Sequence, residues 1–262
     1  MFPKRLLAPG FLTVMNLFLG YYSIVLAAKG SLSSAAWLII IAAVFDAFDG
    51  KVARATNSTS KFGNEFDSLA DVISFGLAPS FLIYQAHFHT MEPAGLLIAF
   101  FPLMFGAIRL ARFNIQISGS EKVNFSGLPI PVAAGTLVSF ILFNLNIWDE
   151  MMLKSMMLPL VIIISLLMVS TLEFDAIPKF NFRSGKRNSI LFLVLLTGII
   201  TVVFFPHEAM FPLSLFYIIY SSVRGLLRLG REKTTGRVRH GKHILRRKKR
   251  QAIDENQTGN DQ

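Results

Sequence analysis

Cysteine is absent from the sequence and charged residues are scarce, and each shortage excludes a class of protein. Without cysteine there is no disulfide framework, no thiolate metal site and no cysteine nucleophile. Charged residues make up only 16% of the 262 residues, whereas soluble domains contain about 25%. Apolar residues make up 53%, and Phe alone occurs 25 times. This composition indicates a chain built mainly for the interior of a lipid bilayer.

Positive charge is concentrated near the C-terminal end. The formal net charge is +10, and twelve of the 26 Lys and Arg residues lie between Arg224 and Arg250. A basic segment that follows an apolar helix is typical of a cytoplasmic tail lying against anionic lipid. No aromatic stacking platform accompanies these bases, so we expect membrane lipids and no nucleic acid as partners.

Eight apolar segments approach the length of about 20 residues that a membrane-spanning helix requires. They are Leu6–Ala28, Ser33–Phe48, Ser68–Phe88, Pro93–Ile108, Leu128–Trp148, Met152–Leu172, Ser189–Phe205 and Met210–Leu227. The predicted fold class is therefore all-α, a polytopic membrane protein with about eight transmembrane helices. The last two segments are separated by only a few residues around Pro206, which predicts a tight helical hairpin.

The loops between these segments predict how the protein lies in the membrane. Lys and Arg gather before the first segment, after the second, fourth and sixth, and in the tail, while the alternate loops contain few. By the positive-inside rule both termini face the cytoplasm, and we expect a multi-pass protein of the inner (plasma) membrane. Lys4 and Arg5 before an apolar run that ends in Ala27 and Ala28 also fit a secretory signal. The run is long for a signal and more spans follow, which favours an uncleaved helix.

Four aspartates lie where the second apolar segment ends and the third begins. Asp46 and Asp49 are three residues apart, and Asp67 and Asp71 are four apart. Either spacing puts both side chains on one face of a helix, so the two pairs are expected to face each other at one depth. Charges at membrane depth are costly unless they are paired or hydrated. Opposed carboxylate pairs suit divalent cations, which prefer hard oxygen ligands.

Small and basic residues around the two pairs suit a nucleotide diphosphate. Gly50 and Ala53 leave room for a base or ribose beside the helix, and Arg54 can reach a phosphate. Gly63 is expected to permit a tight turn or a close backbone approach before the third segment. Taken singly, an Asp at a helix end is usually a cap and a Gly usually marks a turn. The full array at fixed intervals favours a metal and nucleotide site.

This array resembles that of a known family. The pattern D-x2-D-G-x2-A-R-x8-G-x3-D-x3-D is typical of the CDP-alcohol phosphatidyltransferases, and the sequence matches every defined position. The resemblance implies a six-helix membrane core that forms a homodimer, with two extra C-terminal helices in this chain. The expected parts are a catalytic membrane domain over residues 1–205, a C-terminal transmembrane hairpin arm over 206–229 and a basic cytoplasmic tail over 230–262. We expect this tail to be disordered.

The resemblance also implies a role for each residue of the array. Mg²⁺ or Mn²⁺, expected as two ions, would be held by Asp46, Asp49, Asp67 and Asp71. The CDP group would be contacted by Asp49, Gly50, Ala53, Arg54 and Gly63. Asp71 would also be the catalytic base that takes the proton of the acceptor alcohol, with CMP as the leaving group. A metal-bound carboxylate is a weak base, so the share of proton abstraction that Asp71 performs stays open.

Three flanking motifs look like those of the membrane-bound members of this family that use L-serine. They are Val72–Pro79, Arg109–Asn114 and Phe125–Pro131. The resemblance therefore implies an enzyme that transfers the phosphatidyl group of CDP-diacylglycerol to L-serine and produces phosphatidylserine.

Serine carries an ammonium and a carboxylate, so its site requires a cation and hydrogen-bond acceptors. Arg109 and Arg112 share a helix face, and one of them can clamp the carboxylate with two hydrogen bonds. Asn114 can orient the amine or the carboxylate. Alternatively, the two arginines are positive-inside anchors and Asn114 is a helix cap. Residues 127–131 alternatively only begin the fifth helix.

Other functions compete with this interpretation. A family member that uses glycerol 3-phosphate also needs arginines, so charge alone does not decide the acceptor. A cation transporter would use the four acids as an ion site, but such proteins often carry inverted repeats, and the acids here occur in one region only. A lipid-binding scaffold would act through the basic tail.

Overall fold

The computed structural model describes residues 7–55, 60–91, 93–118, 127–172, 174, 197–198, 200–202 and 204–228. The elements are α1 (Leu7–Ala28), α2 (Leu32–Ala55), α3 (Lys61–Asp71), η2 (Val72–Leu77), α4 (Ala78–Ala86), η3 (Phe88–Met91), α5 (Ala94–Ser118), α6 (Ile130–Trp148) and α7 (Lys154–Val169). η2 is a π-helix and η3 is a 3-10 helix. A further helix, Pro206–Arg228, follows, and we call it the C-terminal helix.

Six helical stretches of the described residues are long and apolar enough to cross a membrane. They are Gly10–Ala28, Leu32–Val52, Lys61–Ala86, Ala94–Ile115, Ile130–Trp148 and Pro206–Arg228. The described residues contain no strand, so the prediction of an all-α polytopic membrane protein is confirmed. α7 is apolar but has only 16 residues. The predicted segment Ser189–Phe205 lies mostly outside the described residues, and the domain boundaries stay a prediction.

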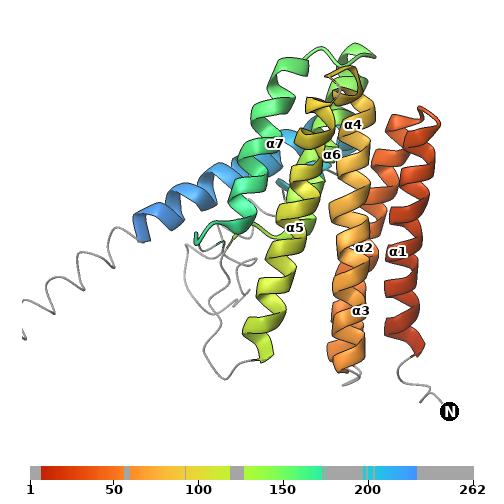
Figure 1. The fold of residues 1–262 in the computed structure, drawn as a ribbon, viewed down its shortest axis with the longest axis vertical. Coiled ribbons are helices and arrows are strands. Elements are labelled where there is room, and N and C mark those ends of the chain that lie inside the picture. Colours follow the sequence, from red (N-terminus) through yellow and green to blue (C-terminus); the bar gives the residue numbers. More distant parts are fainter. Residues whose placement is uncertain are drawn as a thin grey trace, which may run out of the picture.

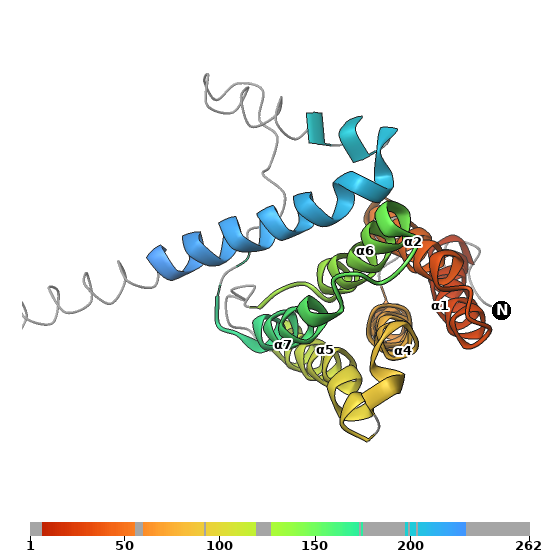
Figure 2. The same cartoon turned by 90° about the horizontal axis from the view of Figure 1, so that it is seen from above.

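The helices form an upright bundle around α6 (Figures 1 and 2). Seen from above, α6 lies between α2 and α7, with α4 beside it (Figure 2). Leu137, Phe140 and Ile141 of α6 are fully buried, as are Leu82 and Ile83 of α4. Because lipid tails are as apolar as these side chains, close packing and interhelical hydrogen bonds hold such a bundle together. α4 is joined through η2 to α3, so this packing anchors the span that carries Asp67 and Asp71.

The C-terminal helix runs away from the bundle at an angle (Figure 2). Its first turns contact the bundle, because the ring of His207 lies 5.3 Å from that of Trp37 and the ring of Phe211 lies 5.0 Å from that of Phe140. Further along, large apolar side chains such as Phe216 are exposed. An apolar surface on a spanning helix suits contact with lipid.

The third span begins earlier than predicted. α3 begins at Lys61 instead of Ser68, because Ser60 caps it and its Oγ accepts a hydrogen bond from the Gly63 backbone N at 2.9 Å. Asp67 and Asp71 therefore lie within a helix. Of the two alternatives expected for Gly63, the tight turn is wrong, since Gly63 lies in the first turn of α3, and the close backbone approach stays a prediction.

A π-helical segment, η2, follows Asp71 directly and joins α3 to α4. Gly20 of α1 lies against it, and a Cβ on Gly20 would come within 2.7 Å of Ser74 Cα. Only glycine permits so close an approach of the two backbones. The Ser74 hydroxyl also donates a hydrogen bond to the Asn16 backbone O at 2.9 Å. α1 is thereby fixed against the segment that follows Asp71.

Candidate active site

Three of the four aspartates meet between α2 and α3. Asp46 extends from α2, and Asp67 and Asp71 extend from α3. One carboxylate oxygen from each of the three lies within 4.8 Å of the others. The three oxygens are close enough to surround one small cation.

Burial makes this acidic group unusual. Asp71 is 9% exposed, Asp46 and Asp67 are half-buried, and Asp67 Oδ1 is buried without a hydrogen-bond partner. Buried carboxylates that lie close together repel, and each also loses the water that would stabilise its charge. A divalent cation with oxygen ligands removes the repulsion and supplies the missing partner of Asp67. The residues present therefore fit a divalent metal ion.

Asp49 lies beside this group rather than within it. It is 6% exposed, and its Oδ2 accepts a hydrogen bond from the Thr13 hydroxyl of α1. Its charge still acts on Asp46 and Asp67. Asp49 can therefore add negative charge to the site and can serve as a ligand to a second metal ion. One of its two carboxylate oxygens is already hydrogen-bonded to Thr13 of α1.

The residues predicted to contact CDP lie on the same two helices. Gly50 follows Asp49 on α2 and is half-buried, and Gly63 lies at the beginning of α3. Ala53 and Arg54 belong to the last turns of α2, but their side chains lie outside the described part of the chain. The end of α2 and the beginning of α3 thus lie together at the acidic end of the bundle.

Arg109 lies within electrostatic range of Asp71. It was predicted near the end of the fourth segment, at Ile108, but α5 continues to Ser118, so Arg109 lies well inside a helix. Its charge interacts with that of Asp71, and its Nε is buried without a hydrogen-bond partner. Arg109 can therefore donate to an anionic group that enters the site.

Arg112 contacts the end of α7. Its guanidinium donates to the backbone O of Val169 at 3.3 Å and to that of Ser170 at 3.5 Å. Carbonyl groups at a helix C-terminus lack partners within the helix, and a nearby arginine satisfies them. This contact indicates a structural role for Arg112.

Gly127 and Leu128 hold the same end of α7. The backbone N of Gly127 donates to Leu172 O at 2.8 Å, and that of Leu128 donates to Leu167 O at 2.9 Å. Gly127 has a φ of +88°, and a Cβ there would come within 2.2 Å of Met168 O. The interpretation of residues 127–131 as only a helix start is therefore incomplete, because this segment also anchors α7.

Asn114 ties α5 to α3. Its Nδ2 donates to Ser68 Oγ at 3.1 Å and to Glu65 Oε2 at 3.3 Å. The alternative of a helix cap is wrong, because α5 continues past Asn114 to Ser118. The contact lies one residue from Asp67, so Asn114 helps to hold the acid-bearing helix.

Thr13 and Asn16 of α1 also belong to the site. The sequence interpretation gave Thr13 no role and gave Asn16 a role in helix packing, with lining of a lipid site as the alternative. Asn16 Nδ2 donates to Asp71 Oδ1 at 3.4 Å, and Asn16 is 0% exposed. The available signal was their spacing, since Thr13, Asn16 and Gly20 recur every three or four residues along an apolar helix.

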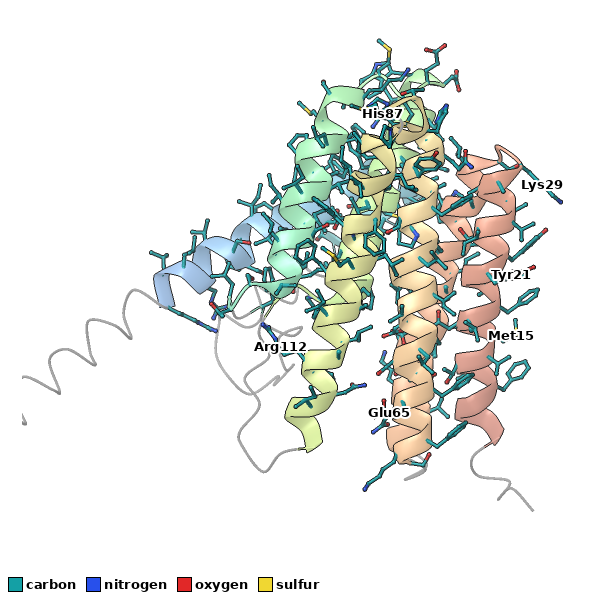
Figure 3. The ribbon with its side chains drawn as sticks, in the orientation of Figure 1. Met15, Tyr21, Lys29, Glu65, His87 and Arg112 are labelled. Carbon is teal, nitrogen blue, oxygen red and sulfur yellow. The ribbon has the colours of Figure 1, made fainter. Side chains whose placement is uncertain are left out.

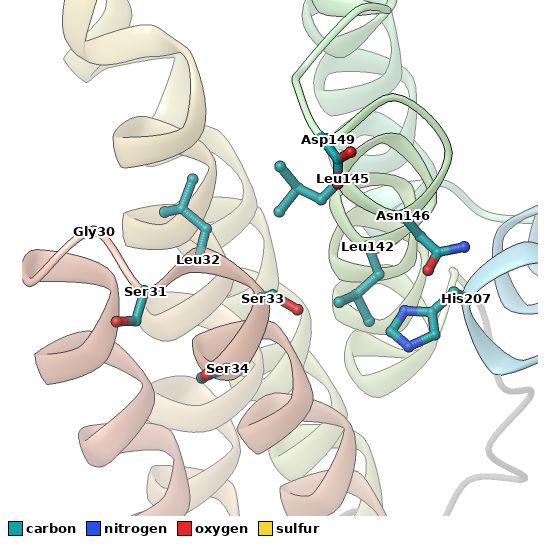
Figure 4. Close-up of a pocket in the computed structure, with 10 residues that line it drawn as sticks. All are labelled: Gly30, Ser31, Leu32, Ser33, Ser34, Leu142, Leu145, Asn146, Asp149 and His207. Carbon is teal, nitrogen blue, oxygen red and sulfur yellow. The ribbon is translucent and has the colours of Figure 1, made fainter.

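A separate pocket of about 550 Å³ opens at the other end of the bundle (Figure 4). Its lining comes from the α1–α2 turn, the beginning of α2, α6 with the residue that follows it, and the C-terminal helix, namely Gly30, Ser31, Leu32, Ser33, Ser34, Leu142, Leu145, Asn146, Asp149 and His207. Ser33 lies thirteen residues before Asp46 on α2, which corresponds to roughly 20 Å along a helix. This pocket is therefore not the acidic site.

His87 lies at that same far end, away from Glu65 and Arg112 (Figure 3). Burial lowers the pKa of His87, and the charges of Lys154 and His89 lower this pKa further. A lowered pKa keeps the imidazole neutral at pH 7. His87 takes no part in the acidic group.

Comparison with known proteins agrees with this site. Residues 6–200 match the CDP-alcohol phosphatidyltransferase family, and the chain belongs to that family. It is 38% identical over 221 residues to a CDP-diacylglycerol–serine O-phosphatidyltransferase of Helicobacter pylori, covering 84% of this chain and 91% of the relative. It is 40% identical over 171 residues to an archaetidylserine synthase of Methanothermobacter thermautotrophicus, covering 64% and 70%. A Bacillus subtilis CDP-diacylglycerol–serine O-phosphatidyltransferase is 34% identical over 188 residues, covering 69% and 98%.

Proposed function

We propose that this protein transfers the phosphatidyl group of CDP-diacylglycerol to the hydroxyl of L-serine, giving phosphatidylserine and CMP. One observation carries the proposal. Three carboxylates, those of Asp46, Asp67 and Asp71, gather next to Arg109 between two membrane helices, in a chain whose similar relatives bear the names of serine-using transferases.

The acids provide the ligands for Mg²⁺ or Mn²⁺. Asp46, Asp67 and Asp71 would hold the first ion, and Asp49 would contribute to a second. When bound, such ions neutralise charge on the pyrophosphate and polarise the phosphorus under attack. Gly50, Ala53 and Gly63 are proposed to contact the CDP group beside the acids, and Arg54 is proposed to pair with one of its phosphates.

The reaction exchanges one phosphate ester for another. The serine hydroxyl oxygen forms a bond to the phosphorus that carries diacylglycerol, and the bond from this phosphorus to the bridging oxygen breaks. CMP leaves with that oxygen and its electron pair. The hydroxyl proton passes to a carboxylate, for which Asp71 is the best candidate because it is the most enclosed acid of the group.

Arg109 is the preferred ligand for the carboxylate of serine. Its Nε is buried and unpartnered beside Asp71, whereas Arg112 contacts the end of α7 and Asn114 contacts α3. A guanidinium binds a carboxylate through two parallel hydrogen bonds. Serine-binding roles for Arg112 and Asn114 stay predictions.

The acidic end of the bundle is proposed to face the cytoplasm. The N-terminal end of α1 lies at this end (Figure 1), as do Glu65 and Arg112 (Figure 3). Lys51, Arg54 and Lys61 lie at the helix ends that flank the α2–α3 connection, and Arg109, Arg112 and Lys122 lie in the C-terminal half of α5 and in the α5–α6 connection. Bases in such positions stay on the cytoplasmic side. We further propose a homodimer in the plasma membrane, with the basic tail against anionic lipid.

The proposed acceptor is tested by an acceptor panel. Purified protein is supplied with CDP-diacylglycerol and, separately, labelled L-serine, glycerol 3-phosphate, inositol phosphate, choline or ethanolamine. We expect labelled lipid and CMP with L-serine alone. Lipid formed from glycerol 3-phosphate and not from serine would overturn the acceptor, and no CMP release with any alcohol would favour a cation transporter.

Replacing Arg109 with Gln is expected to raise the KM for serine by about tenfold to a hundredfold, since a charged hydrogen-bond pair is lost. The KM for CDP-diacylglycerol should change much less. The measurement is a serine titration at saturating CDP-diacylglycerol. Lys154→Gln removes one positive charge from an exposed position at the far end of the bundle and serves as the control. A serine KM that stays at the wild-type value in Arg109→Gln would contradict the assignment.

A further inference from the structure

α1 is an apolar helix that carries polar side chains on its buried face. Thr13 is 5% exposed, and Asn16 and Ser23 are 0% exposed. Together with Gly20 they recur every three or four residues, which aligns them along one side of the helix. Met15 and Tyr21 point away from the bundle (Figure 3). Polar groups buried between membrane helices are costly unless they find partners.

The partners of Thr13 and Asn16 are the acids themselves. The Thr13 hydroxyl donates to Oδ2 of Asp49, and Asn16 Nδ2 donates to Oδ1 of Asp71 at 3.4 Å. One acid comes from α2 and the other from α3, so α1 holds one member of each predicted pair. The Gly20–Ser74 contact fixes the position of α1 along its axis relative to η2. It thereby places Thr13 and Asn16 at the same depth in the bundle as Asp49 and Asp71.

Asn16 also retains an unused group. Its Oδ1 is buried without a hydrogen-bond partner. A buried polar atom without a partner costs free energy, and a leucine of similar shape would avoid that cost. Helix packing alone therefore does not explain an asparagine here, whereas an amide that must orient a carboxylate does.

We propose that Thr13 and Asn16 are positioning residues that tie one oxygen of Asp49 and one of Asp71 to α1 and thereby fix the orientation in which these acids bind divalent cations. The inference rests on the proposed metal-dependent function. Hydrogen-bond donors behind metal ligands set the direction of the ligand, and losing one typically weakens metal affinity tenfold to a hundredfold.

The test compares Thr13→Val, Asn16→Leu and Thr13→Ser in the purified full chain. Val has the shape of Thr without its donor, Leu approximates Asn, and Ser keeps the hydroxyl. Thermal unfolding is followed while MnCl₂ is titrated in the absence of substrates, and the Mn²⁺ requirement of the reaction is measured in parallel. We expect the half-saturating Mn²⁺ concentration to rise by about tenfold or more in Thr13→Val and Asn16→Leu. Thr13→Ser should return it close to the wild-type value.

Ser23→Ala is the matched control. It removes the hydrogen bond from Ser23 Oγ to Ala35 O, at 2.8 Å, from the same face of α1 without touching an acid. Its unfolding temperature should fall while its Mn²⁺ titration matches that of the wild type. The proposal is overturned if Thr13→Val behaves in the same way as Ser23→Ala. If Asn16→Leu does not fold, Thr13→Val alone decides. If Mn²⁺ does not stabilise the wild type at all, the metal site itself fails together with the inference.

Discussion

Replacing Asp71 with Asn is expected to lower phosphatidyl transfer by at least about a thousandfold, while the protein still inserts into the membrane. Asn has the shape of Asp, so packing at this buried position is kept, but it carries no negative charge and does not accept a proton. The variant therefore loses a metal ligand and the candidate base together. The measurement is CMP release from CDP-diacylglycerol in the presence of L-serine.

Asp149→Asn is the control for this loss. It makes the same chemical change at an exposed residue that lines the pocket at the far end. Its positive φ of 55° is one that Asn adopts readily, so transfer should stay at the wild-type rate. Asp46→Asn and Asp49→Asn should also abolish turnover. Transfer by Asp71→Asn at more than a tenth of the wild-type rate would show that the reaction does not depend on the acidic group.

The meeting of the acids could be predicted from the sequence because it depends on local geometry. Spacings of three and four residues place Asp46 with Asp49, and Asp67 with Asp71, on one face of their helices. The short connection between two apolar segments makes those helices antiparallel neighbours. Together these two facts bring the pairs to one depth without any knowledge of the remaining helices.

Helix ends were harder to predict. The length of an apolar run indicates which residues lie inside the membrane, but it does not indicate where the helix begins or ends. Ser60 caps α3 well before the apolar run begins, and α5 continues ten residues past Ile108. Polar helical turns outside the bilayer carry no hydropathy signal, so Asn114 was expected as a possible cap where it is a link between α5 and α3. The π-helical segment after Asp71 packs closely against Gly20 of α1, and no local sequence pattern predicted that contact.

Tertiary partners decide which polar residue serves the site. Arg109 and Arg112 share a helix and a residue type, yet one lies beside Asp71 and the other contacts the end of α7. The sequence alone does not separate them, because the position of α7 depends on the packing of the whole bundle. The roles of Thr13 and Asn16 could not be predicted for the same reason, since their hydrogen-bond partners, Asp49 and Asp71, lie far along the chain.

Removal of divalent metal is expected to reduce transfer by at least about a thousandfold, with full recovery when Mg²⁺ or Mn²⁺ is supplied in excess over the chelator. The reason is electrostatic. Asp46, Asp67 and Asp71 each place one carboxylate oxygen within 4.8 Å of the other two, and without a cation these carboxylates repel the pyrophosphate of the substrate as well as each other. The measurement is CMP release after dialysis against EDTA, followed by titration of the metal.

A control must show that EDTA lowers transfer by removing the metal and not by acting on the detergent or the lipid. EDTA saturated with Mg²⁺ beforehand has the same bulk effects and should leave transfer unchanged. Asp67 adds a second criterion, because its Oδ1 is buried without a protein partner and a bound cation is the partner it lacks. Asp67→Asn should therefore need a higher concentration of Mn²⁺ for recovery than the wild type. Undiminished transfer in thoroughly chelated protein would mean that these acids do not act by binding a metal. The phosphate ester would then be exchanged without a cation to neutralise the charge of the pyrophosphate.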